Sequence, residues 1–185
     1  MLIRSALLGD LNGCLALDAN SQTDHVWQMG KRSTLAGVID INFREIRLPR
    51  IMRVTYPRSP DLLADEWSKR LQVLVAEKDG RVCGYSALMK APAPGAVWLT
   101  DLVVGLPERR TGVGSGLLLE SMRWSAASGF DRIFAELQSK NYPAVSLLKK
   151  FGFSFSGYSD SYFPDQDIAL FFVGDCRAPG KESGS

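Results

Sequence analysis

A run of glycines and arginines at residues 109–117 has the composition of a phosphate-binding turn. The run reads Arg-Arg-Thr-Gly-Val-Gly-Ser-Gly-Leu and lies between an apolar stretch and a helical pattern. Glycines let the backbone approach a ligand without an obstructing Cβ. The first amides of a helix have no partners within the helix and carry partial positive charge. With the two full charges of Arg109 and Arg110 nearby, the segment predicts a cradle for a pyrophosphate.

Two common phosphate motifs fit this run less well. A dinucleotide-binding fingerprint needs a third glycine where Leu117 stands, and a P-loop needs a Gly-Lys-Ser/Thr sequence that the chain lacks. On these residues alone, a glycine-rich turn without any ligand remains the alternative.

A second motif begins at Asn141, 29 residues after Gly112, and reads Asn-Tyr-Pro-Ala-Val-Ser-Leu-Leu-Lys-Lys-Phe-Gly-Phe. With both motifs in this order and at this spacing, the chain resembles the GNAT superfamily of N-acetyltransferases. The family's motif A is R/Q-x-x-G-x-G/A after a strand, and its motif B is N-x-x-A-x-x-L-(Y)-x-x-x-G-F after the next strand. The resemblance covers residues 71–158 well and is one of topology before them.

The resemblance implies acetyl-CoA as cofactor and no metal. In the family the pantetheine arm lies between two strands that splay apart, which here correspond to residues 98–104 and 131–137. The backbone groups expected to pair with the pantetheine amides and the thioester carbonyl belong to Leu102, Val103 and Val104. The amides expected to take the pyrophosphate belong to Arg109, Arg110, Thr111, Gly112, Val113, Gly114 and Ser115. Asn141 matches the family asparagine that reaches the cofactor arm.

The resemblance also implies direct transfer of the acetyl group to an amine. The amine must lose a proton before it attacks, so a base is needed, and Glu136 and Asp101 on the two splayed strands are the candidates. A salt-bridged or edge-exposed acid is the alternative for each. Many relatives protonate the leaving thiolate with a tyrosine in motif B, but Leu148 occupies that position here. Tyr162, from the segment after motif B, is a candidate replacement.

The segment Ser159–Asp167 combines three aspartates with aromatic residues. Such a lining suits a cationic amine: a small molecule, a lysine side chain or a peptide N-terminus. A merely solvated acidic loop is the alternative. The predicted function is an N-acetyltransferase that moves an acetyl group from acetyl-CoA to a primary amine. The competing hypothesis is a GNAT-fold acyl-CoA-binding or regulatory module without transfer activity. A homodimer is possible by analogy with the family.

The elements that must position these residues follow from patterning. Strands are predicted at 3–6, over 38–56, at 71–77 and 82–89 around an Asp-Gly turn, at 96–104, 131–137, 153–158 and 168–173. Helices are predicted at 11–20, 60–69, from 112 to a stop at Gly129, and at 143–150. Residues 21–34 show no clear pattern. The fold class is therefore α/β (α+β). With the resemblance, it becomes a central mixed, mostly antiparallel sheet with splayed middle strands and flanking helices.

Composition limits the remaining possibilities. The 185 residues are 45% hydrophobic and 23% charged, with 22 basic against 20 acidic residues, which predicts one globular domain over 1–175 and a disordered tail over 176–185. The near-neutral balance gives no nucleic-acid footprint, and no apolar run reaches membrane-spanning length. Three scattered cysteines form neither a disulfide framework nor a zinc pattern. The expected location is the cytoplasm.

Overall fold

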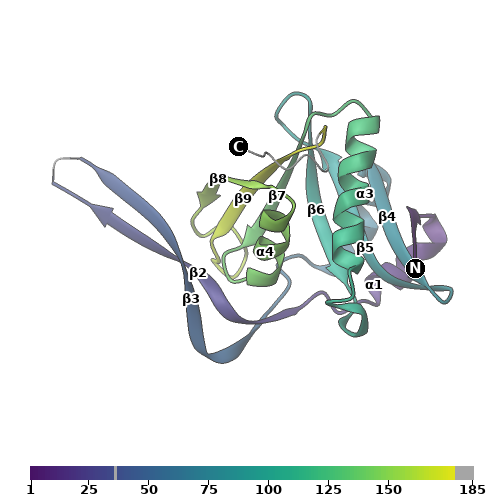
Figure 1. The fold of residues 1–185 in the computed structure, drawn as a ribbon, viewed down its shortest axis with the longest axis horizontal. Coiled ribbons are helices and arrows are strands. Elements are labelled where there is room, and N and C mark those ends of the chain that lie inside the picture. The colour runs from purple at the N-terminus through teal and green to yellow at the C-terminus, as the bar shows by residue number, and fades with distance from the viewer. Residues whose placement is uncertain (36, 178–185) are drawn as a thin grey trace, which may run out of the picture.

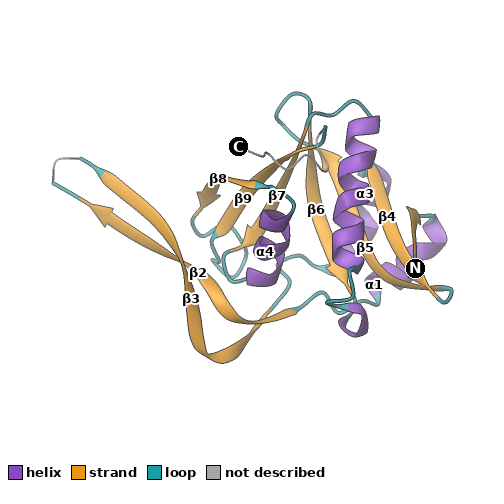
Figure 2. Cartoon of the chain, in the orientation of Figure 1, coloured by secondary structure: helices purple, strands orange, loops and turns teal. Residues whose placement is uncertain are grey.

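The computed structural model describes residues 1–35 and 37–177, which form a seven-stranded sheet and a separate two-stranded ribbon (Figures 1 and 2). The strands of the large sheet are, in spatial order, β1 (Leu2–Ser5), β4 (Gln72–Lys78), β5 (Arg81–Lys90), β6 (Ala96–Val104), β7 (Arg132–Gln138), β9 (Ala169–Asp175) and β8 (Ser154–Ser159). Only the β6–β7 pair is parallel. The predicted mixed, mostly antiparallel sheet is confirmed.

Helices cover both faces of this sheet. On one face lie α3 (Val113–Ala127) and α4 (Tyr142–Lys150), in front of the sheet in Figure 1. On the other lie α1 (Leu11–Leu15) and α2 (Pro60–Asp65). Alternation along β5 serves both layers, because Leu88 packs toward α3 while its neighbour Ala87 packs toward α1 and α2. Three short 3₁₀ turns complete the helical set: Leu8–Asp10, Trp67–Lys69 and Leu106–Glu108.

The parallel pair places the two motifs at one edge of the sheet. Parallel neighbours need a crossover connection, and α3 supplies it between β6 and β7. The first residues of α3 therefore follow the carboxyl end of β6, and Asn141, the N-cap of α4, follows the carboxyl end of β7. Ligands of parallel sheets bind at such an edge.

The ribbon consists of β2 (Ser21–Ser33) and β3 (Ile39–Val54), which pair antiparallel and project from the body of the molecule (Figure 1). The strand predicted over 38–56 is confirmed. Its partner covers residues 21–33, where the sequence shows no pattern, because much of the ribbon is exposed on both faces and does not need strict alternation of apolar and polar residues.

Three boundaries differ from the predictions. The helix predicted over 60–69 ends at Asp65 and is followed by the 3₁₀ turn Trp67–Lys69. The first α-helix ends at Leu15 rather than Asn20, and the Asp18 carboxylate instead accepts a hydrogen bond from the Asn20 amide at 3.0 Å and forms a turn. Cys176, assigned to the tail, is fully buried and its amide donates to the Asp131 carbonyl at 2.9 Å. Packing thus continues past residue 175, while the tail from residue 178 lies outside the described residues. No helix within 1–35 and 37–177 is long and apolar enough to cross a bilayer.

Candidate active site

The central feature of the site is the gap between β6 and β7. The two strands pair only from Ala96 with Arg132 to Leu99 with Ala135. Beyond these residues β6 stays with β5, where the register shifts around Thr100, and β7 stays with β9. The strands therefore part after Leu99 and Ala135, and Thr100 and Glu136 are the first residues that no longer pair across the gap. A cavity occupies the gap, lined by Tyr56, Pro57, Arg58, Leu99, Thr100, Leu102, Ala135, Glu136, Leu137, Gln138, Asn141, Ala144 and Leu148.

The N-terminus of α3 provides a row of unpaired amides near this gap. Its N-cap is Gly112, whose φ of 97° lies in the left-handed region and whose missing side chain leaves open space. No side chain caps the helix, and among the described residues the amides of 110–115 donate to no protein acceptor. Several free N–H groups at a helix N-terminus fit the two phosphates of a pyrophosphate.

The Arg109 side chain is held by backbone carbonyl groups. Its guanidinium donates to the carbonyl groups of Val104 at 2.9 Å, Asn20 at 2.7 Å and Asp18 at 2.6 Å. Burial of the guanidinium lowers the pKa of Arg109. Its side chain therefore ties the end of β6 to the α1–β2 connection. The expectation that both arginines place a full charge beside the cradle stays a prediction. Arg110 is exposed.

The motif that begins at Asn141 closes the opposite wall of the cavity. The Asn141 side chain accepts a hydrogen bond from the Ala144 amide at 3.4 Å and so caps α4, which leaves its NH₂ group available to a ligand in the cavity. Leu148, at the family tyrosine position, also lines the cavity and is only 1% exposed. This wall therefore offers no phenol to the cavity.

Glu136 lies at the mouth of the gap with two partners. Its carboxylate is ion-paired with Arg58 and accepts a hydrogen bond from the Tyr162 hydroxyl at 2.9 Å. Its side chain is 8% exposed. Burial and this hydrogen bond raise the pKa of Tyr162. Tyr162 is thus bound to the carboxylate and does not line the cavity between the strands, whereas Glu136 does.

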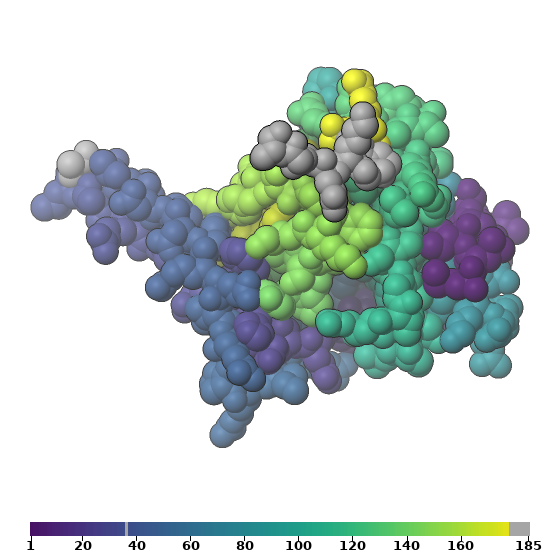
Figure 3. Space-filling view, in the orientation of Figure 1, coloured from purple at the N-terminus to yellow at the C-terminus, as the bar shows by residue number. Residues whose placement is uncertain are grey.

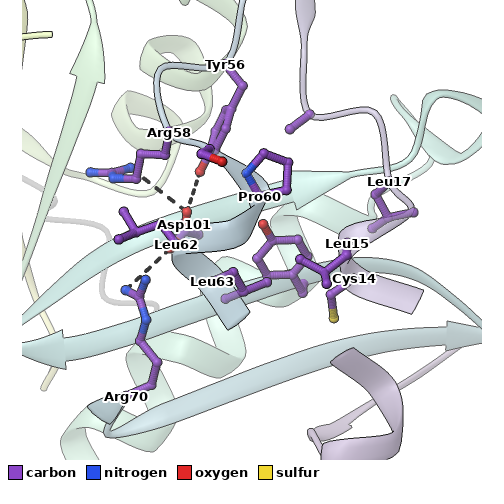
Figure 4. A pocket seen from close by; sticks show the side chains of 13 residues that line it. Cys14, Leu15, Leu17, Tyr56, Arg58, Pro60, Leu62, Leu63, Arg70 and Asp101 are labelled. Atoms are coloured by element: carbon purple, nitrogen blue, oxygen red, sulfur yellow. Dashed lines mark hydrogen bonds and ion pairs between the residues drawn. The ribbon is translucent and has the colours of Figure 1, made fainter. Parts of the chain in front are cut away.

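Asp101 lies deeper and is surrounded by donors (Figure 4). Its carboxylate accepts from the Tyr56 hydroxyl at 2.6 Å and the Thr100 hydroxyl at 2.8 Å. Guanidinium nitrogens of Arg70 and Arg58 lie 3.5 and 4.0 Å away. Although only 4% exposed, this carboxylate thus has two hydroxyl donors and two guanidinium neighbours. Burial and the neighbouring Asp101 charge raise the pKa of Tyr56 well above its usual value.

A second cavity lies beside Asp101, between α1, α2 and the sheet. Its lining residues are Cys14, Leu15, Leu17, Ala19, Tyr56, Arg58, Ser59, Pro60, Leu62, Leu63, Arg70, Tyr85 and Asp101. Tyr56 and Arg58 line both cavities and separate them. Because Arg58 also contacts the Thr100 carbonyl, this one guanidinium links both strands at the point where they part.

The structure therefore brings the three predicted catalytic residues into one network with three residues that the sequence did not indicate: Tyr56, Arg58 and Arg70. These three precede the recognisable motifs. The one local signal is the stretch Tyr56-Pro57-Arg58-Ser59-Pro60, and Arg70 lies outside it. Nothing in that stretch shows which strand it contacts.

Comparison with known proteins identifies the family. The model of the acetyltransferase (GNAT) family matches residues 35–153. The chain belongs to this family. Acetyl-CoA is therefore its cofactor, and the open cradle, the parted strands and Asn141 fit that molecule. No curated protein sequence matches the chain significantly.

Solved structures share the fold at low sequence identity. A nourseothricin acetyltransferase has a TM-score of 0.79 at 21% identity, with 95% of this chain and 98% of that chain covered. A Bacillus anthracis protein assigned as a streptothricin acetyltransferase, in complex with acetyl-CoA, has a TM-score of 0.72 at 17% identity, with 94% and 98% covered. The ribosomal-protein-S18-alanine N-acetyltransferase of Escherichia coli has a TM-score of 0.68 at 15% identity, with 100% and 99% covered.

Proposed function

We propose that this GNAT acetyltransferase transfers the acetyl group of acetyl-CoA to a primary amine by direct attack, with Glu136 as the general base. The observation that carries the proposal is the place of Glu136, on β7 at the first residue where β6 and β7 no longer pair. Of the two candidate carboxylates, Glu136 lines the gap between the strands, whereas Asp101 lines the second cavity beyond Tyr56 and Arg58.

Bound acetyl-CoA supplies the electrophile, an acetyl thioester. The amides of 110–115 and the Asn141 side chain hold the cofactor in this proposal, and the β6 backbone from Leu102 to Val104 pairs with its pantetheine part. The Val104 carbonyl oxygen already accepts a hydrogen bond from Arg109, so it can accept one more, from the pantetheine part. Glu136 then takes a proton from the acceptor amine, directly or through water, because only a neutral amine can attack.

Tyr56 is the candidate proton donor to the leaving thiolate. Tyr56 is the one tyrosine among the described residues that line the gap between the strands, because Leu148 occupies the position of the family tyrosine. Burial keeps its hydroxyl protonated but also makes it a weak acid, so in this proposal the proton passes to the thiolate as the Tyr56–Asp101 hydrogen bond breaks. Tyr56→Phe should lower kcat about 10²-fold and leave the Kd for coenzyme A unchanged. If Tyr56→Phe left kcat unchanged, solvent rather than Tyr56 would protonate the thiolate.

The acceptor is proposed to be a cationic amine, either a small molecule or a peptide or protein amine. The Tyr162 ring and the carboxylates of Glu136 and Asp101 supply aromatic and acidic groups on this side of the site. The names of the neighbours cover both classes: nourseothricin and streptothricin on one side, and the alanine of a ribosomal protein on the other. A first panel should therefore contain nourseothricin, streptothricin and an alanine-initiated peptide. The cytoplasmic location stays a prediction.

Release of free thiol from acetyl-CoA, measured with this panel and with calorimetry of coenzyme A on the same preparation, tests the proposal. Amine-dependent thiol release supports it. Tight binding of the cofactor with no turnover on any amine would favour the alternative, an acyl-CoA-binding module without transfer activity. Absence of binding by the folded protein would contradict both.

A further inference from the structure

Arg58 is a cation shared between the two strands that part at the site. It belongs to the connection between β3 and α2, residues 55–59, which follows directly on the ribbon that projects from the body (Figure 3). Its guanidinium contacts the Thr100 carbonyl on β6 and the Glu136 carboxylate on β7, at the first residues that no longer pair. The two strands thus present two oxygen acceptors to one cation.

These two oxygens suit a primary ammonium group as well as a guanidinium. An ammonium has three N–H donors and a full positive charge, so a carboxylate and a carbonyl oxygen together satisfy two of its donors and its charge. Thr100 and Glu136 both line the cavity between the strands, so a ligand in that cavity reaches both. The pair of oxygens is therefore a cation site, and Arg58 is the cation that occupies it.

Arg58 is the more accessible of the two guanidinium groups in this network. The Arg70 side chain is 2% exposed and is ion-paired with Asp101 at 3.5 Å and with Glu66 at 3.3 Å. The Arg58 side chain is 17% exposed and lines a cavity on each of its sides. Because protein interiors are close-packed, a side chain moves most easily where a cavity adjoins it. Arg58 has such space in two directions.

A second carboxylate can receive the guanidinium when it leaves Glu136. An oxygen of Asp101 lies 4.0 Å from Arg58, on the side of the second cavity. Asp101 itself is fixed by the hydrogen bond from the Tyr56 hydroxyl at 2.6 Å. Glu136 keeps the hydrogen bond from the Tyr162 hydroxyl at 2.9 Å. A move of Arg58 from one carboxylate to the other therefore leaves neither of them without a donor.

We propose that the Glu136 carboxylate and the Thr100 carbonyl form the binding site for the ammonium group of the acceptor, and that Arg58 occupies this site until the acceptor displaces it toward Asp101. The inference rests on the proposed function, in which Glu136 is the base. Arg58 then determines specificity, because a primary ammonium competes with a guanidinium for a carboxylate, whereas a neutral hydroxyl or amide does not. The bound ammonium places one N–H proton on the Glu136 oxygen that takes it, which leaves a neutral amine to attack.

Removal of the guanidinium should open the site to a small amine, and this can be measured without acetyl transfer. The probe is n-propylammonium chloride, titrated through the millimolar range in thermal unfolding of the wild type and of Arg58→Ala. A ligand at about ten times its Kd raises the Tm of a protein of this size by about 3 °C. This shift is expected for Arg58→Ala and not for the wild type. Tetramethylammonium chloride, a cation without N–H donors, should change neither Tm.

Further variants connect the shift with the oxygens of the site. Arg58→Ala combined with Glu136→Gln keeps the opened space but lacks the carboxylate, so propylammonium should not raise its Tm. Arg58→Lys keeps a cation within reach of Glu136 and should respond as little as the wild type. Arg58→Gln is a second neutral variant, which carries the test if Arg58→Ala shows no cooperative unfolding.

The kinetic test uses an amine of the acceptor panel that the wild type acetylates. In Arg58→Ala the acceptor no longer has to break a charge-assisted hydrogen bond in order to bind, so its KM should fall about tenfold. Arg58→Lys should restore the KM. A purely structural role of Arg58 would lower Tm in Arg58→Ala and leave KM unchanged.

Three results would overturn the proposal. The first is an equal Tm shift by propylammonium in the wild type and in Arg58→Ala, because Arg58 would then not occupy the site. The second is no shift in Arg58→Ala and Arg58→Gln, or the same shift when Glu136→Gln is added. The third is an unchanged KM in Arg58→Ala. Absence of turnover by the wild type would instead contradict the proposed function, and the Tm shifts would still decide whether the cation site exists.

Discussion

Replacing Glu136 by glutamine tests its proposed role as the general base. The amide has the same shape as the carboxylate and keeps an oxygen that can accept from the Tyr162 hydroxyl, now 2.9 Å from the carboxylate. It cannot take up a proton. Loss of a positioned base costs about 10²–10⁴ in rate, and at 1.36 kcal/mol for each tenfold this is about 3–5 kcal/mol of transition-state stabilisation. The cradle at the start of α3 is untouched, so the Kd for coenzyme A should not change.

The assay compares Glu136→Gln with two matched variants. Asp160→Asn removes an exposed acid of the acceptor-side segment and should leave kcat within twofold. Asp101→Asn removes the charge between Arg58 and Arg70, and the uncompensated guanidinium groups should cost about 3 kcal/mol of stability. Both variants should lower Tm, because each removes an anionic partner of Arg58. The difference between them is therefore expected in kcat, which Glu136→Gln should lower about 10²–10⁴-fold.

The dependence of kcat/KM on pH decides between the two carboxylates. If Glu136 is the base, its glutamine variant loses the acid limb that the wild type and Asp160→Asn share. An intact profile and an unchanged kcat in Glu136→Gln would refute the assignment. If Asp101→Asn were folded, bound coenzyme A normally and alone lost the limb, the base would be Asp101.

Three further outcomes follow from the structure. Gly112 and Gly129 are both left-handed and have equally open surroundings, so Gly112→Ala and Gly129→Ala should each cost about 1 kcal/mol of stability. Only Gly112→Ala should weaken the binding of coenzyme A, measured by calorimetry. Equal affinities of the two variants for coenzyme A would contradict the cradle. The Arg4 hydrogen bond lowers the pKa of Asp10 below 3.8, so the stabilisation of the fold by this pair is complete above that value and is lost as the pH falls through the lowered pKa. Urea unfolding should therefore show Asp10→Asn destabilised by about 1.5 kcal/mol at pH 7 and not in strong acid. A stability difference that persists in strong acid would contradict this linkage. Burial raises the pKa of the Cys14 thiol to about 12, so at pH 8 iodoacetamide should label it at least about a hundredfold more slowly in the native than in the unfolded protein; equal rates by mass spectrometry would show that the cavity opens.

The part of the fold that the sequence predicts well is the part with local signals. The run around Asp79-Gly80 has a hairpin turn, β6 is an almost continuous apolar strand, and α3 begins and ends at glycines in the left-handed conformation. Each signal acts over a few residues, so no distant contact needs to be known. The first strand of the ribbon, β2, lacks such signals, because much of the ribbon is exposed on both faces.

The site shows the same division. The cradle and Asn141 belong to local motifs, whereas the direction of the Arg109 side chain depends on carbonyl groups about 90 residues earlier in the chain. Likewise, Tyr56 reaches Asp101 across 45 residues and Arg58 reaches Glu136 across 78. Contacts of this kind are set by how the loop before α2 folds over the sheet, and no spacing rule encodes them.

The position of Arg58 connects the shape of the site with the kind of acceptor proposed. Its guanidinium is a cation held between Glu136, the Thr100 carbonyl and Asp101 at the mouth of the gap between the strands. An acceptor ammonium that approaches Glu136 competes with this cation for the same carboxylate. The loop that carries Arg58 joins β3 to α2 and lies outside both cofactor motifs. In the proposed function, recognition of the acceptor therefore depends on this loop, while recognition of coenzyme A depends on the first turn of α3.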